Sequence, residues 1–142
     1  MTRRVLLDTN MLIGALEPEP DNVQHQAARS RFRALMDDPE IEPVITPLVR
    51  YEVLRGVRRI SFDKMKSELD GFQEFDVRSE EANRAAELFR LAKGAGMNLD
   101  KRSFDLFHCA CADVNGLKIE SQDPHIRKIQ QLIQGSQQNA KA

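Results

Sequence analysis

The sequence predicts an α/β fold with a short central parallel sheet flanked by layers of helices. Three apolar runs, at residues 4–7, 43–45 and 117–119, have the length of strands that are buried on both faces. The segments between them repeat apolar residues at spacings of three and four, which is typical of amphipathic helices. Strands that alternate with helices form parallel sheets, and such folds bind their ligands at the carboxyl ends of the strands.

The first elements are bounded by clear polar signals. The strand at residues 4–7 ends at the triplet Asp8-Thr9-Asn10. Residues 21–39 predict a helix, because a capping-box-like start is followed by helical apolar spacing and a closing proline. The strand at residues 43–45 is followed by Thr46-Pro47, a favourable N-cap and a favourable first helical residue, so the next helix begins where this strand ends.

The middle of the chain is mainly helical. A helix is predicted from about Ser61, with apolar residues at helical spacing: Phe62, Met65, Leu69 and Phe72. Residues 75–77 predict a brief strand, and Ser79 predicts the cap of a further helix that stops at Gly94 and Gly96.

The last part of the chain adds two helices and one strand. Residues 100–115 predict a helix that Gly116 ends, with four residues facing inward: Phe104, Phe107, Cys111 and Val114. The strand at residues 117–119 follows, and Asp123-Pro124 opens the last helix. A chain of 142 residues fits one domain, which we predict at residues 1–134, with a flexible polar tail at residues 135–142.

The composition is that of an ordinary globular domain. Twenty-two acidic and 21 basic side chains give a net charge of −1, so any affinity for nucleic acid requires a local patch. The apolar runs are far shorter than the roughly 20 residues that span a bilayer, and no signal-peptide core is present, so a cytoplasmic protein is expected. Cys109 and Cys111 point to different sides of a helix, and we expect them to be reduced packing residues, as we expect of His108.

Four carboxylates follow strands or open helices: Asp8, Glu52, Asp105 and Asp123. Each alone has an ordinary structural explanation, such as an Asx turn, an ion pair with Arg55 or a favourable helix dipole. Together they would repel one another unless a cation neutralised them. Hard cations such as Mg²⁺ take oxygen ligands, and paired metals serve many nucleases, so hydrolysis of a phosphate ester is the predicted chemistry.

The same acids carry a resemblance to a known family. The chain resembles the PIN-domain nucleases, particularly the VapC-type toxins of bacterial toxin–antitoxin pairs, from about residue 4 to residue 133. Four segments in the right order carry it: Leu6-Leu7-Asp8-Thr9-Asn10, Tyr51-Glu52-Val53-Leu54-Arg55-Gly56, Asp105-Leu106-Phe107-His108-Cys109-Ala110-Cys111-Ala112 and Ser121-Gln122-Asp123.

The resemblance implies a fold, an activity and partners. The fold would be PIN-like, with three layers in the order α/β/α, and the activity that of an endoribonuclease. Asp8, Glu52 and Asp105 would be the core acids that hold Mg²⁺ or Mn²⁺, and Asp123 the more variable fourth acid. Thr9, Asn10 and Ser121 would support the site. The chain would act as a toxin on RNA, form a homodimer and be neutralised by a cognate antitoxin protein.

A basic stretch follows the second predicted strand. Six basic side chains stand against two acidic ones between residues 50 and 66: Arg50, Arg55, Arg58, Arg59, Lys64 and Lys66. We predict that Arg55 and Arg59 share a helical face with Glu52 and attract the RNA backbone. With one Tyr and no Trp, the sequence does not predict an aromatic platform for stacking bases.

Other protein classes also place acids at strand ends. An aspartate-nucleophile phosphatase would need a second Asp at position 10, where Asn10 stands. A receiver-like signalling domain would need a phosphoacceptor Asp on a middle strand, and no strand supplies one convincingly. A non-catalytic PIN-like module that binds RNA or protein stays open as an alternative.

Overall fold

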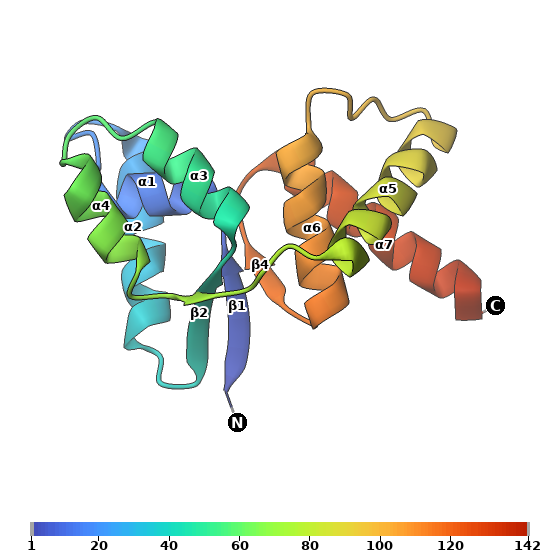
Figure 1. The fold of residues 1–142 in the computed structure, drawn as a ribbon, viewed down its shortest axis with the longest axis horizontal. Helices are drawn as coiled ribbons and strands as arrows, with labels where there is room; N and C mark the ends of the chain where they lie inside the picture. The colour runs from blue at the N-terminus through green and yellow to red at the C-terminus, as the bar shows by residue number, and fades with distance from the viewer. Residues whose placement is uncertain (1, 142) are drawn as a thin grey trace. The chain divides into compact units, whose positions relative to one another are not determined.

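The structure, a computed structural model, describes residues 2–141, with side chains as far as Gln137. Its four strands are β1 (Arg3–Leu7), β2 (Ile41–Ile45), β3 (Gln73–Glu74) and β4 (Lys118–Glu120). They form one parallel sheet in the order β3-β2-β1-β4 (Figure 1). Val5 pairs with Pro43 on one side and with Lys118 on the other, so β1 is a central strand. The predicted α/β class with a short parallel sheet is confirmed.

The chain divides into two compact units, which are described separately. The first, here called the sheet unit, comprises Met1–Asp76 and Lys118–Glu120. It holds the sheet and the helices α1 (Thr9–Leu16), α2 (Val23–Asp37), α3 (Pro47–Arg55) and α4 (Phe62–Leu69). The second, the helical unit, comprises Val77–Leu117 and Ser121–Ala142, with α5 (Ser79–Gly94), α6 (Ser103–Asn115) and α7 (Pro124–Lys141).

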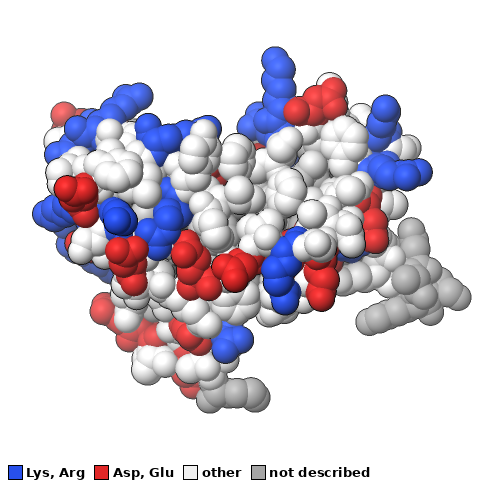
Figure 2. Space-filling model, viewed as in Figure 1, with Lys and Arg blue, Asp and Glu red and all other residues white. Residues whose placement is uncertain are grey.

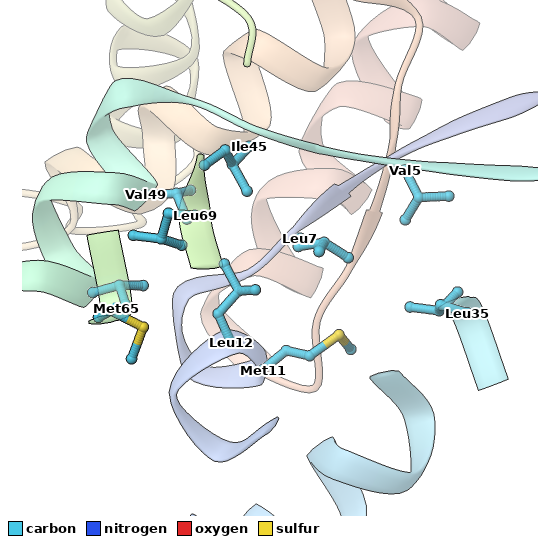
Figure 3. Packing of buried hydrophobic residues seen from close by; sticks show 10 residues of the cluster. Val5, Leu7, Met11, Leu12, Leu35, Ile45, Val49, Met65 and Leu69 are labelled. Atoms are coloured by element: carbon cyan, nitrogen blue, oxygen red, sulfur yellow. The ribbon is translucent and has the colours of Figure 1, made fainter. Parts of the chain in front are cut away.

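The core of the sheet unit is built from the strands and all four of its helices. Leu7 and Ile45 from the strands, and Leu12, Val49, Met65 and Leu69 from α1, α3 and α4, are fully buried in one cluster (Figure 3). Burying a side chain of this size stabilises the fold by about 1.5–3 kcal/mol relative to exposure. In the central strand β1, Val5, Leu6 and Leu7 are all buried, so both faces of this strand are covered, which explains its continuous apolar run.

Helices α1 and α2 cross closely at Gly14. A Cβ atom on Gly14 would lie 2.8 Å from the Cβ of Ala28 and 3.2 Å from the Cα of His25. Real Cβ atoms do not approach so closely, so any larger residue here would push the two helices apart.

Side-chain caps set the starts of three helices, and the cap at Thr46 was predicted from the sequence. The Oγ1 of Thr46 accepts from the backbone N–H of Val49 at 3.3 Å, and Pro47 is the first residue of α3. Ser61 accepts from the N–H of Lys64, and Asn22 accepts from that of His25. Each cap pairs a backbone donor that the first helical turn leaves without an intrahelical partner.

The helical unit contains a buried carboxylate. The side chain of Glu81 has no exposed surface, and its oxygens accept from the backbone and guanidinium of Arg78 and from Nδ2 of Asn115 at 3.2 Å. Burial raises the pKa of Glu81, but the hydrogen bonds from Arg78 and Asn115 outweigh it and lower the pKa to about 2. Glu81 thereby ties the start of α5 to the end of α6, where Gly116 adopts φ 64° and closes the helix.

Several sequence predictions need correction. Helix α1 was not predicted, and the third strand lies at Gln73–Glu74 rather than at residues 75–77. Ser79 is the first residue of α5, and Arg78 occupies the N-cap position. In α6 the most buried residues are Leu106 and residues 108–112, whereas three of the four residues predicted to face inward are only half-buried: Phe104, Phe107 and Val114.

The C-terminal helix is longer than predicted. Helix α7 continues to Lys141, so helical backbone is present where the sequence predicts a polar tail from residue 135. Ala142 and the side chains beyond Gln137 lie outside the described residues, and the flexibility of residues 135–142 stays a prediction. Within the described part of the chain, none of the helices combines the length and the hydrophobicity that a membrane span requires.

Candidate active site

Asp8 occupies the position that the sheet favours for a functional residue. It directly follows the central strand β1 and is the N-cap residue of α1, with the extended backbone angles φ −74° and ψ 147°. Its residue surface is only 7% exposed, and its carbonyl oxygen accepts from the N–H of Leu12. Asp8 is thus a buried carboxylate at the carboxyl end of a parallel strand, where α/β folds bind ligands.

Glu52 lies on α3 and is joined to the residue after Asp8. The Oγ1 of Thr9 donates to Oε1 of Glu52 at 2.9 Å, although the two residues are 43 positions apart. Thr9 is buried, and Glu52 is half-buried with 16% of its side chain exposed. Thr9 therefore fixes one carboxylate oxygen of Glu52 beside the carboxyl end of β1. Asn10, the other predicted support in this segment, is exposed on α1.

The two candidate RNA-binding arginines are placed differently. The guanidinium of Arg55 lies 3.9 Å from Glu52 Oε2, and more than half of its side chain is exposed. Arg59 does not share this helical face, because α3 ends at Arg55 and Gly56 caps it. Instead, the backbone N–H of Arg59 donates to the buried carboxylate of Glu17 and its guanidinium pairs with Glu19 at 3.2 Å. The prediction of one helical face for Glu52, Arg55 and Arg59 is wrong at Arg59.

The helical unit carries the other two predicted acids. Asp105 lies in the first turn of α6, where the guanidinium of Arg102 is 3.9 Å from one carboxylate oxygen. Asp123 directly precedes α7, and its Oδ1 accepts from the backbone N–H of His125 at 2.8 Å and lies 3.1 Å from the ring Nδ1. The N–H of Asp123 donates to the hydroxyl of Ser121 at 3.0 Å. Ser121 and His125 thus hold the backbone and the side chain of Asp123.

His108 and the two cysteines are packing residues, as predicted. His108 is 2% exposed, and both cysteines are buried and reduced. Burial, followed by the charge of Glu81, raises the pKa of the Cys111 thiol to about 11. A thiol that stays protonated is a poor metal ligand, so Cys111 does not compete with the carboxylates for a cation.

The four acids are divided equally between the units. Asp8 and Glu52 belong to the sheet unit, and Asp105 and Asp123 to the helical unit. Within either unit, no group of three or more His, Cys, Asp or Glu side chains among the described residues is close enough to hold a metal ion. The predicted donors are all oxygen atoms, which suits a hard divalent cation.

A pocket in the sheet unit was not predicted from the sequence. It has a volume of about 340 Å³ and is lined by Pro47, Arg50, Tyr51, Leu54, Arg55 and Phe62. Tyr51 and Phe62 are each 53% exposed, and both line this pocket. Helical spacing alone assigns Phe62 to the core, and only the position of α4 beside α3 shows that it faces the pocket.

Comparison with known protein families identifies this combination of fold and acids. A model of the PIN domain matches residues 5–132, which include all four predicted acids. The chain belongs to the PIN-domain family. PIN nucleases generally use divalent metal ions, and the PIN-domain toxins of the VapC type are nucleases. The resemblance noted in the sequence and the PIN-like three-layer α/β/α fold class are confirmed.

Several solved structures have a fold similar to that of this chain. One is a toxin–antitoxin complex from Klebsiella pneumoniae, with 20% identity, a TM-score of 0.63 and coverage of 84% of this chain and 86% of that chain. VapBC2 from Rickettsia felis, bound to a DNA fragment from its promoter, has 18% identity and a TM-score of 0.62, with coverage of 84% and 87%. FitAcB from Neisseria gonorrhoeae has 19% identity and a TM-score of 0.63, with coverage of 84% and 87%. No curated protein matches the sequence.

Proposed function

We propose that this PIN-domain protein is a Mg²⁺-dependent endoribonuclease and the toxin of a type II toxin–antitoxin pair. The observation that carries the proposal is the PIN-domain match over residues 5–132, within which all four predicted acids are present. Asp8, Glu52, Asp105 and Asp123 are the proposed catalytic acids. We infer a single PIN domain at residues 1–134 and the cytoplasm as the site of action, as the sequence predicts.

The four carboxylates are the proposed ligands of Mg²⁺, with Mn²⁺ as the natural substitute. A divalent cation supplies Lewis acidity, which makes a bound water more acidic and stabilises negative charge on a phosphodiester. Thr9 orients the Glu52 carboxylate through its 2.9 Å hydrogen bond. The backbone N–H of His125 orients the Asp123 carboxylate by donating to its Oδ1 at 2.8 Å, and Ser121 holds the Asp123 backbone by accepting from its N–H at 3.0 Å. The hydrogen bonds from Thr9 and His125 restrict the rotation of these two carboxylates and so reduce the entropy that ligand binding costs.

The substrate proposal depends on charge near Glu52. Arg55 is exposed and adjoins the Glu52 carboxylate, so it is placed to neutralise a phosphate of an RNA strand near that acid. Arg59 contributes less in this proposal, because its ion pair with Glu19, at 3.2 Å, is shorter than that of Arg55 with Glu52 and its side chain is less exposed. On the visible face in Figure 2, basic side chains, with some acidic ones among them, border an uncharged area over the α3–α4 end of the sheet unit.

The partners are proposed from the relatives. The similar structures are complexes of toxins with antitoxins, which supports a cognate antitoxin protein for this chain. A homodimer is the assembly that the family resemblance implies.

The proposal is tested by incubating total cellular RNA with the purified protein in Mg²⁺ or Mn²⁺, with EDTA as the metal-free control. We expect discrete fragments with metal, none with EDTA and none with Asp8→Asn. Asp21→Asn is the matched control, because Asp21 is an exposed aspartate outside the predicted site, and it should cleave at the wild-type rate. Cleavage by Asp8→Asn at the wild-type rate would show that the acid assignment is wrong. RNA binding without cleavage in any metal would favour a non-catalytic PIN-like module.

A further inference from the structure

The pocket between α3 and α4 combines an apolar surface with a cationic edge. Its lining is mostly carbon from Pro47, Leu54 and the rings of Tyr51 and Phe62. Its volume of about 340 Å³ lies at the lower end of the roughly 300–1,000 Å³ range of small-molecule sites. Exposed aromatic rings are costly to leave in water, so a pair of them at one pocket indicates a surface that binds something.

Two of the lining residues already form a stacked pair. The guanidinium carbon of Arg55 lies 5.3 Å from the centroid of the Tyr51 ring, within the range of a cation–π contact. The same guanidinium is 3.9 Å from Glu52. Arg55 therefore connects the aromatic side of the pocket to a proposed catalytic acid one residue away from Tyr51.

The second arginine of the pocket is neutralised by other groups. Arg50 donates to Asp70 at 2.8 Å and to Glu74 at 2.9 Å, and only 22% of its side chain is exposed. Asp70 and Glu74 lie on the segment that follows α4, so the two ion pairs of Arg50 connect α3 to that segment and stabilise this side of the pocket. Arg55, which has an acidic neighbour at 3.9 Å and is more than half exposed, is the more accessible of the two positive charges at the pocket.

We propose that this pocket is a nucleobase subsite, in which an unpaired base of the RNA stacks on Tyr51 and Phe62 while Arg55 binds the adjoining phosphate. A nucleobase is a flat aromatic ring and can stack on the rings of Tyr51 and Phe62. The negative phosphate of the same nucleotide complements the guanidinium of Arg55. An acidic helix of a partner protein would also complement the positive charge of Arg55. The adjacency to Glu52 favours RNA, because a nucleotide bound here would lie next to the one whose phosphate is cut. The inference rests on the proposed function and adds an RNA feature to it, an unpaired base beside the cleavage point.

Tyrosine fluorescence provides a direct test. Tyr51 is the only tyrosine of the chain and there is no tryptophan. The tyrosine fluorescence, which is emitted at roughly 300 nm, therefore reports on this pocket alone. A stacked base quenches such a ring. The protein used is Asp8→Asn in EDTA, so that binding is measured without cleavage. It is titrated with a short single-stranded RNA, with an abasic strand of equal length, and with the RNA annealed to its complement.

We expect the single strand to quench the tyrosine emission as it binds. The abasic strand and the duplex should bind, as shown by the anisotropy of a terminal dye, without quenching. Replacing Tyr51 by Ala should weaken binding of the single strand at least about fivefold, the effect typical of one lost stacked base, whereas Tyr51→Phe should bind like the parent. Phe62→Ala keeps the reporter and should reduce the quenching. Leu91→Ala, which removes an exposed apolar side chain from α5, is the matched control and should change nothing.

Two results would overturn the subsite. One is saturable RNA binding by anisotropy with unchanged tyrosine emission, and the other is an equal affinity of the parent and Tyr51→Ala. A tyrosine signal that responds to an antitoxin protein but not to RNA would assign the pocket to protein binding instead. Failure of the proposed function looks different, because a wild-type protein that never cleaves RNA with any metal could still show base-dependent quenching in EDTA.

Discussion

Glu81 makes the stability of the helical unit depend on pH in a way that can be calculated. Its pKa falls from an ordinary value near 4.5 to about 2, because hydrogen bonds from Arg78 and Asn115 outweigh the effect of burial. A shift of this size corresponds to roughly 3 kcal/mol at about 1.36 kcal/mol per pKa unit. Since the Arg78 side chain is 55% exposed and water screens the pair, we expect a smaller contribution of about 2 kcal/mol.

The sign of the effect follows from the direction of the shift. A carboxyl whose pKa is lowered in the folded state stabilises that state above the pKa of the unfolded chain, and the stabilisation is lost as pH falls toward the folded value. For Glu81 the loss occurs between about pH 4.5 and about pH 2. More than half of it is gone at about pH 3.

The assay compares wild type with Glu81→Gln by urea denaturation at pH 7, 5, 4 and 3. At pH 7 and 5 we expect the variant to be less stable by about 2 kcal/mol, and below pH 4 we expect the two free energies of unfolding to converge. The other acidic groups titrate in both proteins, so their contributions cancel when the two free energies of unfolding are subtracted. A stability difference between the two proteins that is constant from pH 7 to pH 3 would refute the assignment of the low pKa to Glu81.

Three further predictions follow from single contacts. Gly14→Ala should lower the free energy of unfolding by about 1–3 kcal/mol, measured by urea denaturation, because the new Cβ would lie 2.8 Å from Ala28; an unchanged midpoint would contradict the close crossing of α1 and α2. Cys111, whose pKa is raised to about 11, should not react with a thiol reagent at pH 8 in the folded protein and should react once the protein is unfolded in urea. Arg55→Ala should weaken RNA binding more at low salt than at high salt, and Arg59→Ala should do so less, because the ion pair of Arg59 with Glu19, at 3.2 Å, is shorter than that of Arg55 with Glu52, at 3.9 Å; equal effects of the two variants would disprove this difference.

The elements that could be predicted from sequence are those with local signals. The helix start at Thr46-Pro47 combines a side-chain acceptor with a residue that needs no backbone donor, and the structure has both features. Helix α1 lacked such a signal. Its sequence is almost entirely apolar and has little polar face, so its periodicity cannot distinguish a buried helix from a strand.

Other features depend on contacts between distant residues. Strand β3 has two residues, and its place at Gln73–Glu74 is set by pairing with Val44 and Ile45. No local propensity determines so short a strand. Helix α6 is buried around most of its circumference from Leu106 to Ala112, so a single inward stripe was the wrong description.

The candidate site was predictable to the extent that it follows strands. A parallel strand places the residue after it at the ligand-binding edge, which identified Asp8 from sequence. The sequence predicted a supporting role for Thr9 but not its hydrogen bond to Glu52, because the two residues are 43 positions apart. The position of Arg59 could not be predicted, because it depends on the carboxylate of Glu17, which accepts backbone donors from the loop after α3.

Helix α3 carries both the catalytic acid and the base-binding residues that we propose for the sheet unit. Glu52 and Arg55 are three positions apart and Tyr51 and Arg55 are four apart, so one guanidinium contacts both a carboxylate and an aromatic ring on neighbouring helical rows. The opposite side of the helix buries Val49 and Val53 completely, and Thr46 caps its start. A helix held at both its core face and its first turn presents its exposed side chains in a fixed arrangement. The proposed acid and the proposed base pocket therefore move together, and RNA that stacks on Tyr51 would be aligned with Glu52 by the helix itself.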